Sequence, residues 1–307
     1  MKKTLFLLAS LCTAAVASSA QIEITGEQGS PPLGQPVPYT YIKNPGTGLP
    51  QGGTGQVWDF SHFLPCDDCL DASLYLPANE QEGLPEGTYQ TKTKVYTLGH
   101  ITPYTIFYHQ NEEGDIYQVG ASFPESILSM QAVSGHPMDQ LTLTAQSKQT
   151  AILEMDYPLH YGKQWATESK DTFIFYIDAP SINIKRLPLH QWSSYTTQYE
   201  IIGSGQLTLP YWEDGQKSTH TYEALLLKYD PVSRLRFTSP AIPDEELAQL
   251  LSLAGVSLES ENRCEAYKFY IREHPLPVLI FRACSGRGTT ERASLQTSLS
   301  QFPPFAK

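Results

Sequence analysis

Short runs of β-branched, aromatic and aliphatic residues alternate with turn residues along most of the chain. Runs of about four to eight such residues, bounded by Gly, Pro, Asn and Asp, are typical of β-strands. We expect strands at Ile22–Thr25, Gln56–Phe60, Ala72–Leu76, Thr88–Thr97, Tyr104–His109, Ile116–Phe123, Leu141–Thr144, Ile152–Tyr157, Thr172–Ile177, Tyr195–Ile202, Gln206–Leu209, Tyr222–Tyr229 and Leu235–Thr238. Because helical periodicity is almost absent, the pattern predicts an all-β fold, an antiparallel β-sandwich or jelly-roll.

Glycine and proline interrupt this pattern in two places. Residues 21–55 are rich in both, and after the first short strand we expect an extended, turn-rich segment. Gly203 and Gly205 break one alternating stretch, which predicts a bulge or a sharp bend. Residues 21–304 are long enough for one large β domain or for two packed β subdomains with a boundary near 130–148.

One amphipathic helix is expected near residues 243–254. Pro243 suits a helix start, the three acids that follow it suit the positive end of the helix dipole, and Gly255 suits the C-terminal cap. The apolar residues of this segment fall at i, i+3, i+4 and i+7, so they share one face. These residues are Leu247, Leu250, Leu251 and Ala254. We expect that face to pack over a sheet edge or a barrel end.

The last two long β runs predict a hairpin centred on His274. If the strands pair symmetrically about this residue, Cys264 lies opposite Cys284. The apolar side chains then share one face, which supports the register because a one-residue slip would reverse every side chain. This face holds Tyr267, Phe269, Ile271, Leu279, Phe281 and Ala283. The other face holds Lys268, Tyr270, Arg272, Ile280 and Arg282.

Four cysteines follow the first 20 residues, and in an exported chain an even number indicates disulfides. The hairpin register predicts a Cys264–Cys284 bond, which leaves Cys66 and Cys69 to each other. The Cys66-x-x-Cys69 spacing has two further interpretations, a redox pair or a metal site completed by His62 or by the distant cysteines. A structural clip is favoured, because the two aspartates inside the motif raise a thiol pKa and an oxidising compartment favours disulfides.

The first 20 residues have the pattern of a secretory signal peptide. Lys2 and Lys3 precede a short apolar run, and small residues occupy the positions before a cleavage site after Ala20. Cys12 offers a lipoprotein alternative, although Leu11 stands where a small residue is wanted. No later stretch of the remaining 287 of 307 residues is apolar enough for a membrane-spanning helix.

Charge and motifs exclude some functions and assign no catalytic, cofactor or metal residues. Removing the two leader lysines changes the formal charge from −11 to −13, which disfavours nucleic acid as a partner. No HExxH, GxSxG, phosphate-binding or dinucleotide motif occurs. A group of aspartates near the CxxC motif could line a calcium site, but a solvated acidic loop is favoured because no Asp-x-Asp-x-Asp-Gly loop is present. This group is Asp59, Asp67, Asp68 and Asp71.

Several segments together resemble uncharacterised secreted β-rich proteins of Bacteroidetes. They are Gln21–Thr25, Gly53–Ser61, Tyr157–Trp165, Gly203–Pro210, Tyr222–Lys228, Tyr267–Tyr270 and Pro277–Ile280. Many such proteins end in a type IX secretion sorting domain, which this sequence lacks. The resemblance implies an exported protein and carries no assigned activity or site residue. The missing sorting strands favour a periplasmic or envelope-associated location over release through the outer membrane.

These observations leave two functions. The first is a non-enzymatic envelope or surface module that binds a protein or a glycan through a β scaffold. The alternative is a secreted hydrolase that acts on glycans through a pair of carboxylates, although the sequence nominates no pair. A concave groove with two carboxylates would favour the hydrolase, and a flat exposed aromatic patch would favour the binding module.

Overall fold

The computed structural model describes residues 22–42, 45, 48–78, 84–97, 100–213, 216–285 and 292–296. The side chains of residues 67–70, 95–97, 100, 213, 284, 285 and 292 lie outside this description. The expected signal peptide and Cys12 also fall outside the described residues. The strands are β1 (Glu23–Ile24), β2 (Pro36–Ile42), β3 (Gly53–Asp59), β4 (Pro65–Pro77), β5 (Tyr89–Thr97), β6 (His100–Gln110), β7 (Ile116–Phe123), β8 (Ser126–Ser129), β9 (Gln140–Leu143), β10 (Gln146–Met155), β11 (Leu159–His160), β12 (Gln164–Ala179), β13 (Ile184–Glu213), β14 (Gln216–Thr238), β15 (Glu259–Ile271), β16 (His274–Ser285) and β17 (Arg292–Gln296). The helices are α1 (Gln131–Ser134), α2 (Asp244–Leu253) and the 3-10 turn η1 (Pro180–Ile182).

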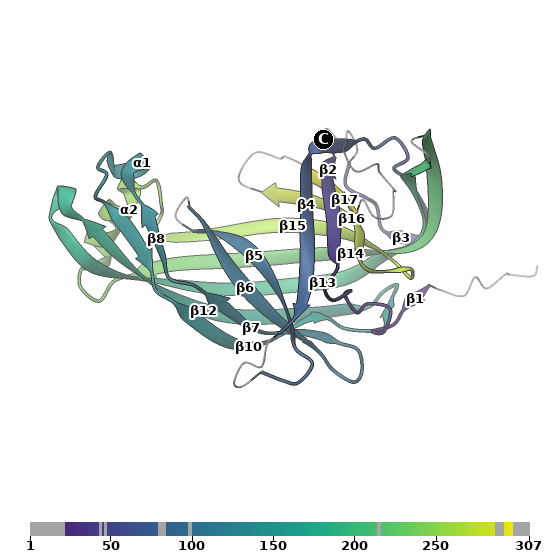
Figure 1. Ribbon diagram of the computed structural model, residues 1–307, viewed down its shortest axis with the longest axis horizontal. Helices are drawn as coiled ribbons and strands as arrows, with labels where there is room; N and C mark the ends of the chain where they lie inside the picture. Colours follow the sequence, from purple (N-terminus) through teal and green to yellow (C-terminus); the bar gives the residue numbers. More distant parts are fainter. Residues whose placement is uncertain are drawn as a thin grey trace, which may run out of the picture.

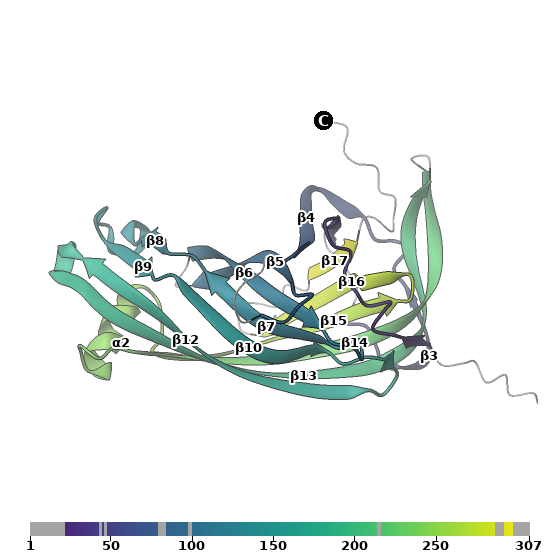
Figure 2. The same ribbon diagram turned by 60° about the horizontal axis from the view of Figure 1, so that its bottom comes forward.

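Nearly all strands belong to one folded-over sheet, so the all-β prediction is confirmed. Its order is β10-β7-β6-β5-β4-β2-β17-β16-β15-β14-β13-β12-β9-β8, and no ladder among the described residues joins β10 to β8 to close it. Figures 1 and 2 show β5, β6 and β7 lying across the long strands β12 to β15 as a second layer. The pairs are antiparallel apart from β3, which runs parallel to β13.

Strand β4 carries the chain from one layer to the other. Its first part pairs with β2, from Pro65 to Leu74, and its last part pairs with β5, from Tyr75 to Pro77. The layers of the expected sandwich are therefore two parts of one continuous sheet. The boundary suggested near 130–148 falls on α1 and β9 and stays a prediction.

Three apolar cores hold the fold together. One lies between β3 with its following loop and one face of strands β14 to β17, around Phe269 and Phe281. A second joins the other face of β14 and β15 to β7 and β11, around Leu225 and Leu159. The third fills the far end of the molecule between β7, β12 and α2, around Phe175 and Leu189.

Helix α2 begins and ends as the sequence predicts. It spans Asp244–Leu253 after Pro243, with three acids in its first turn. Leu247 and Leu251 are buried in the third core, and Leu250 packs against it. The helix therefore covers one end of the sheet, as expected for a helix with a single apolar face.

The bend predicted at Gly203 and Gly205 is confirmed as an irregularity in the β13–β14 ladder, between Ile201 and Gly203. It lies inside one 30-residue strand, where the sequence suggested two separate ones. A Cβ atom on Gly205 would come within 2.0 Å of the Gln56 carbonyl oxygen. Glycine at this position therefore lets β3 approach β13 closely enough to pair with it.

Candidate functional site

The predicted register of the β15–β16 hairpin is confirmed. Cys264 lies opposite Cys284, Tyr267 opposite Phe281, and Phe269 opposite Leu279. An irregularity after Phe269 then lets Ile271 pair with His274 at the turn. The two faces of the hairpin therefore hold the residues that the alternation assigned to them.

The second face of this hairpin lines a cavity of about 310 Å³, which we call the tyrosine cavity. Tyrosines from both layers of the sheet converge on it. They are Tyr39, Tyr41, Tyr75, Tyr89, Tyr108, Tyr157 and Tyr270. Seven of the 18 tyrosines of the chain thus gather at one site. The cavity falls at the lower end of the range of about 300 to 1,000 Å³ that small-molecule sites occupy.

Ring contacts arrange the tyrosines of the crossing layer. The Tyr89 ring stacks on Tyr108 with centroids 5.6 Å apart and meets Tyr75 edge-on at 5.9 Å. Both spacings lie in the favourable range for aromatic pairs. Burial raises the pKa of Tyr89, Tyr108 and Tyr75 above the usual value, so their hydroxyls stay protonated at neutral pH.

Three polar contacts fix the positions of other tyrosines that line the cavity. The Tyr39 hydroxyl donates a hydrogen bond to the Pro277 carbonyl oxygen at 3.0 Å, which ties β2 to the start of β16. The Tyr157 amide donates to the Asp115 carboxylate at 2.7 Å. The Tyr270 hydroxyl lies 3.8 Å from the Met155 sulfur. The lining is therefore built on strands and fixed turns.

Four charged side chains also line the tyrosine cavity: Asp71 from β4, Glu154 from β10, Lys268 from β15 and Arg282 from β16. Burial raises the pKa of Glu154 and lowers that of Lys268 to about 8. The positive charge of Lys268 lowers the pKa of Glu154, and the negative charge of Glu154 raises the pKa of Lys268, so each charge opposes the effect of burial on the other. No ion pair joins the two side chains. Serine and threonine hydroxyls complete the polar part of the lining.

A chain of aromatic contacts supports the two central charges. The Lys268 ammonium lies 4.5 Å from the centroid of the Tyr229 ring, within cation–π range. Tyr229 meets Tyr199 edge-on at 5.2 Å, and the Tyr199 hydroxyl donates to a Glu154 carboxylate oxygen at 3.4 Å. The two charged groups are therefore positioned through the same pair of tyrosines.

The Cys66-x-x-Cys69 motif lies in strand β4 and not at a helix N-terminus. In a straight strand, cysteines three residues apart would be about 10 Å apart, too far for a disulfide. Here the ladder is irregular: Thr40 pairs with Leu70 and Ile42 with Pro65, so five steps along β4 match two along β2. The straight-strand spacing therefore does not apply to residues 66–69, and the motif is not at the helix N-terminus that a redox pair uses.

The two disulfides stay predictions, because the side chains of Cys69 and Cys284 lie outside the described residues. Neither Cys66 nor Cys264 is a free thiol. Cys66 is buried, and its carbonyl oxygen accepts a hydrogen bond from the Thr40 hydroxyl at 2.8 Å.

The aspartates near this motif do not gather into a metal site among the described side chains. Asp59 accepts a hydrogen bond from the Ser61 amide at 2.9 Å, which closes a local turn. Asp71 belongs to strand β4 and lines the tyrosine cavity. The side chains of Asp67 and Asp68 lie outside the described residues.

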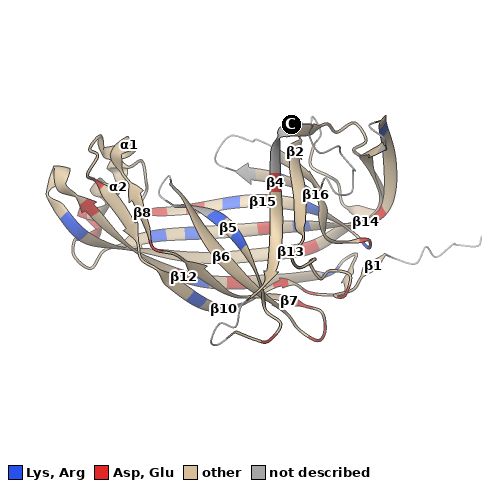
Figure 3. Cartoon of the chain, viewed as in Figure 1, with Lys and Arg blue, Asp and Glu red and all other residues tan. Residues whose placement is uncertain are grey.

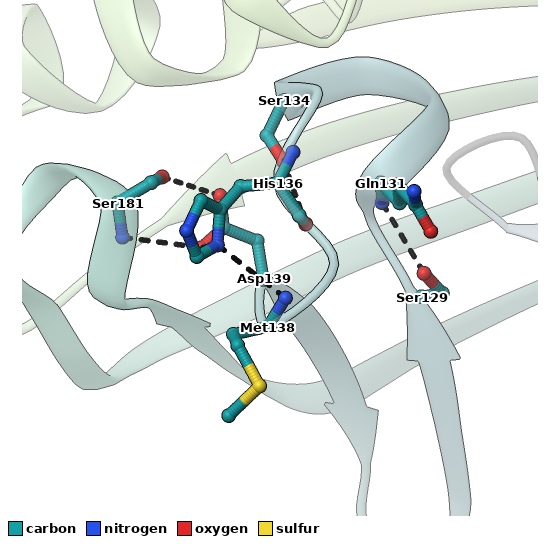
Figure 4. A network of polar contacts seen from close by, with 7 residues as sticks. All are labelled: Ser129, Gln131, Ser134, His136, Met138, Asp139 and Ser181. Atoms are coloured by element: carbon teal, nitrogen blue, oxygen red, sulfur yellow. Dashed lines mark hydrogen bonds and ion pairs between the residues drawn. The ribbon is translucent and has the colours of Figure 1, made fainter.

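A serine, a histidine and an aspartate meet near α1, but in the wrong order for a nucleophilic triad. Figure 4 shows Ser181 and His136 both directed at Asp139, with the Ser181 hydroxyl donating to the carboxylate. In a triad, the histidine must lie between the serine and the acid. The His136 ring nitrogen accepts from the Met138 amide at 3.4 Å. This network therefore fastens the loop before β9 to η1.

Charged residues of both signs occur together elsewhere in the described strands. Figure 3 shows acidic and basic positions interleaved along the long strands. Several basic side chains there pair with neighbouring acids, such as Arg234 with Glu261 and Arg236 with Glu259. Among the described residues, no helix is long and apolar enough to cross a membrane.

The sequence placed Lys268, Tyr270 and Arg282 on one face of the hairpin but did not predict what that face meets. No local signal could have shown that Glu154 and the crossing tyrosines would lie against it. No family model matches the chain, and no match was found among curated proteins or solved structures. The tyrosine cavity is therefore interpreted from its own chemistry.

Proposed function

We propose that this protein is an exported envelope or surface protein whose tyrosine cavity binds a glycan without altering it. The observation that carries the proposal is the convergence of seven tyrosines and four charged side chains on one small concavity. Tyrosine rings offer apolar faces to a sugar ring while their hydroxyls remain available for hydrogen bonds. Binding sites for small ligands combine such aromatic walls with a few placed polar groups.

The size and polarity of the cavity favour a glycan over the other candidates. A concavity of about 310 Å³ accommodates a small ligand and not the face of a folded protein. A purely apolar ligand would take water away from the charged groups of Glu154 and Lys268 without offering them hydrogen bonds in return. A short glycan end supplies both ring faces and hydroxyls.

The test is binding of the purified protein to a glycan array, followed by calorimetry with the best ligand. We expect Tyr75→Ala to weaken binding at least tenfold, because Tyr75 lines the cavity. Tyr211→Ala is the matched control, because Tyr211 lies near the end of the hairpin formed by β13 and β14, where its ring stacks on His220, and it does not line the cavity. Equal loss in both variants, or no glycan bound at all, would overturn the proposal.

The export part of the proposal has its own measurement. A signal peptide cleaved after Ala20 predicts a mature protein that begins at Gln21. Mass spectrometry of the protein from envelope fractions should find this terminus. A diacylglycerol on Cys12 would instead make the protein a lipoprotein, and an unprocessed Met1 in the cytosolic fraction would overturn export.

A glycan hydrolase is the second candidate, and one observation favours it. Burial raises the pKa of Glu154, as in the general acid of many glycosidases, and Asp71 supplies a second carboxylate in the same cavity. Incubation of a bound glycan with the protein distinguishes the two functions. Release of shorter sugars, abolished by Glu154→Gln while binding persists, would establish the hydrolase in place of the binding module.

A further inference from the structure

Two basic side chains, Lys268 and Arg282, lie next to each other where the β15–β16 hairpin lines the tyrosine cavity. In the β15–β16 ladder, Lys268 is opposite Ile280 and Ala266 is opposite Arg282. Lys268 and Arg282 are therefore diagonal neighbours, which places their Cβ atoms about 7 Å apart on one face of the sheet. Both line the cavity, and the charge of Arg282 contributes to the lowered pKa of Lys268.

Neither cation has an ion-pair partner among the described residues, in contrast to the opposite face of the same sheet. On that face, Lys228 pairs with Glu265 at 3.6 Å, and Arg263 pairs with Asp230 and Glu265. Lys268 is partly buried and Arg282 is exposed at the same cavity. A partly buried cation without an ion-pair partner is destabilising. Two neighbouring cations of this kind, one partly buried and one exposed, suit a ligand that brings its own negative charge.

The acids of the cavity form no ion pair with either cation. The Glu154 carboxylate accepts a hydrogen bond from the Tyr199 hydroxyl at 3.4 Å. Asp71 is exposed and accepts a hydrogen bond from the Ala72 amide. The Lys268 ammonium and the Arg282 guanidinium therefore leave positive charge on the floor of the cavity.

We propose that the glycan bound in the tyrosine cavity carries a carboxylate, as uronic acid residues do, and that Lys268 and Arg282 bind this group. This inference rests on the proposed glycan-binding function and names the class of sugar. Arginine and lysine together form charge-assisted hydrogen bonds to a carboxylate. The sugar ring then faces the tyrosines, and Glu154 is placed to bond a ring hydroxyl.

The experiment compares a uronic acid oligosaccharide with its carboxyl-reduced neutral counterpart by calorimetry. The wild-type protein should bind the acidic sugar at least tenfold more tightly, and the preference should fall in high salt because screening weakens exposed charges. The double variant Lys268→Met/Arg282→Met should lose the preference while still binding the neutral sugar through the tyrosines. Arg272→Met is the matched control, because Arg272 is in the same hairpin but does not line the cavity.

Each outcome bears on one of the two proposals. Equal affinity of the wild type for acidic and neutral sugars would overturn the carboxylate inference and leave glycan binding standing. Binding of neither sugar would overturn both. A sulfated oligosaccharide is the third ligand, and tighter binding of sulfate than of carboxylate would show that the cations serve a different anionic group. Circular dichroism of the double variant verifies that it is folded.

Discussion

The two faces of the β15–β16 hairpin differ in burial and in the chemistry of their side chains. On one face, Phe269 and Phe281 are almost fully buried in a core that also contains Trp58. On the other face, Lys268 and Arg282 line a polar cavity and remain without an ion-pair partner among the described residues. Successive residues of a strand point to opposite faces, so the same two strands build both regions.

This difference separates stability from binding within one element. The aromatic side chains of the core face pack against other aromatic rings of the protein: Phe269 contacts both Trp58 and Phe281. The cavity face is not paired in this way, because Lys268 and Arg282 have no ion-pair partner among the described side chains. Functional sites often hold unpaired or partly buried polar groups that lower the stability of the fold. Replacing such groups by apolar ones then adds stability while removing function.

The largest expected effect comes from truncating the core face. Phe269→Ala should lower the free energy of unfolding by about 3 to 5 kcal/mol, because it empties a buried site. Its ring meets Trp58 at 5.0 Å and Phe60 at 5.8 Å. Ile280→Ala on the cavity face should cost less, because this side chain is only half-buried and borders an existing cavity. Urea unfolding of both variants measures the contrast, and equal losses would show that the two faces are energetically alike.

The predicted disulfide at the open end of the hairpin should have the next largest effect. Replacing both Cys264 and Cys284 by alanine should cost about 3 kcal/mol, the chain-entropy estimate for a loop of this length. The matched pair Cys66→Ala/Cys69→Ala should cost less, because it closes a much shorter loop. Peptide mapping without reduction identifies the bonds, and a cross-link between the two pairs would contradict the assignment.

The register of this hairpin was predictable because its signal is local. Apolar residues alternate on both sides of His274, and only one pairing sorts them onto a common face. Helix α2 was predictable for a similar reason, since its start, its acidic first turn and its apolar face lie within a dozen residues. In both cases the physical cause of the structure is contained in a short segment.

Other strands gave weaker signals. Strand β2 contains Pro36 and Pro38, which made this stretch resemble a turn-rich segment. The first part of β13 combines Lys185 and Arg186 with Pro188, and these residues obscure the alternation of buried residues that begins at Leu187. Neighbouring strands supply the hydrogen bonds and the apolar contacts that hold these segments in the sheet.

The candidate site could not be predicted, because it depends on the path of the whole sheet. Tyr39, Tyr89, Glu154 and Lys268 come from four separate strands. They meet only because β4 crosses between the two layers and brings β5 to β10 over the hairpin. The alternation in the sequence identified the polar face of the hairpin and contained no information on what would cover it.

Removing the central charges of the cavity should make the protein more stable. Lys268→Met/Glu154→Gln should raise the free energy of unfolding at pH 7 by about 1 to 3 kcal/mol, because two desolvated charges that no ion pair joins are replaced by neutral groups. The control Lys228→Met/Glu265→Gln removes the partly exposed ion pairs that Glu265 makes with Lys228 and Arg263 on the other face, and it should change stability by less than about 1 kcal/mol.

The pH dependence of this gain follows from the sign of each shift. Burial lowers the pKa of Lys268 from 10.5 to about 8, so the wild type is destabilised by its ammonium below pH 8 and is relieved as the pH rises towards 10.5. Burial raises the pKa of Glu154 above 4.5, so its carboxylate is destabilising above its native pKa and harmless at acid pH. The gain should therefore be greatest near neutral pH. Urea titrations of both proteins from pH 4 to about 10 measure it, and a constant difference would show that neither charge is desolvated.

The smallest expected effect distinguishes two tyrosines of the same cavity. Tyr39→Phe should cost about 1 kcal/mol of stability, because it removes the hydrogen bond from the Tyr39 hydroxyl to the Pro277 carbonyl oxygen at the start of β16. Tyr75→Phe keeps the edge-on contact with Tyr89, and its hydroxyl makes no hydrogen bond among the described residues, so stability should change by less than about 0.5 kcal/mol. If the cavity binds a glycan as proposed, the order should reverse for ligand binding, because Tyr75 lines the cavity and the Tyr39 hydroxyl is already bonded to Pro277. Thermal unfolding and calorimetry of the two variants test both orders. If Tyr75→Phe destabilised the fold as much as Tyr39→Phe, its hydroxyl would belong to the structure of the protein and not to the binding surface.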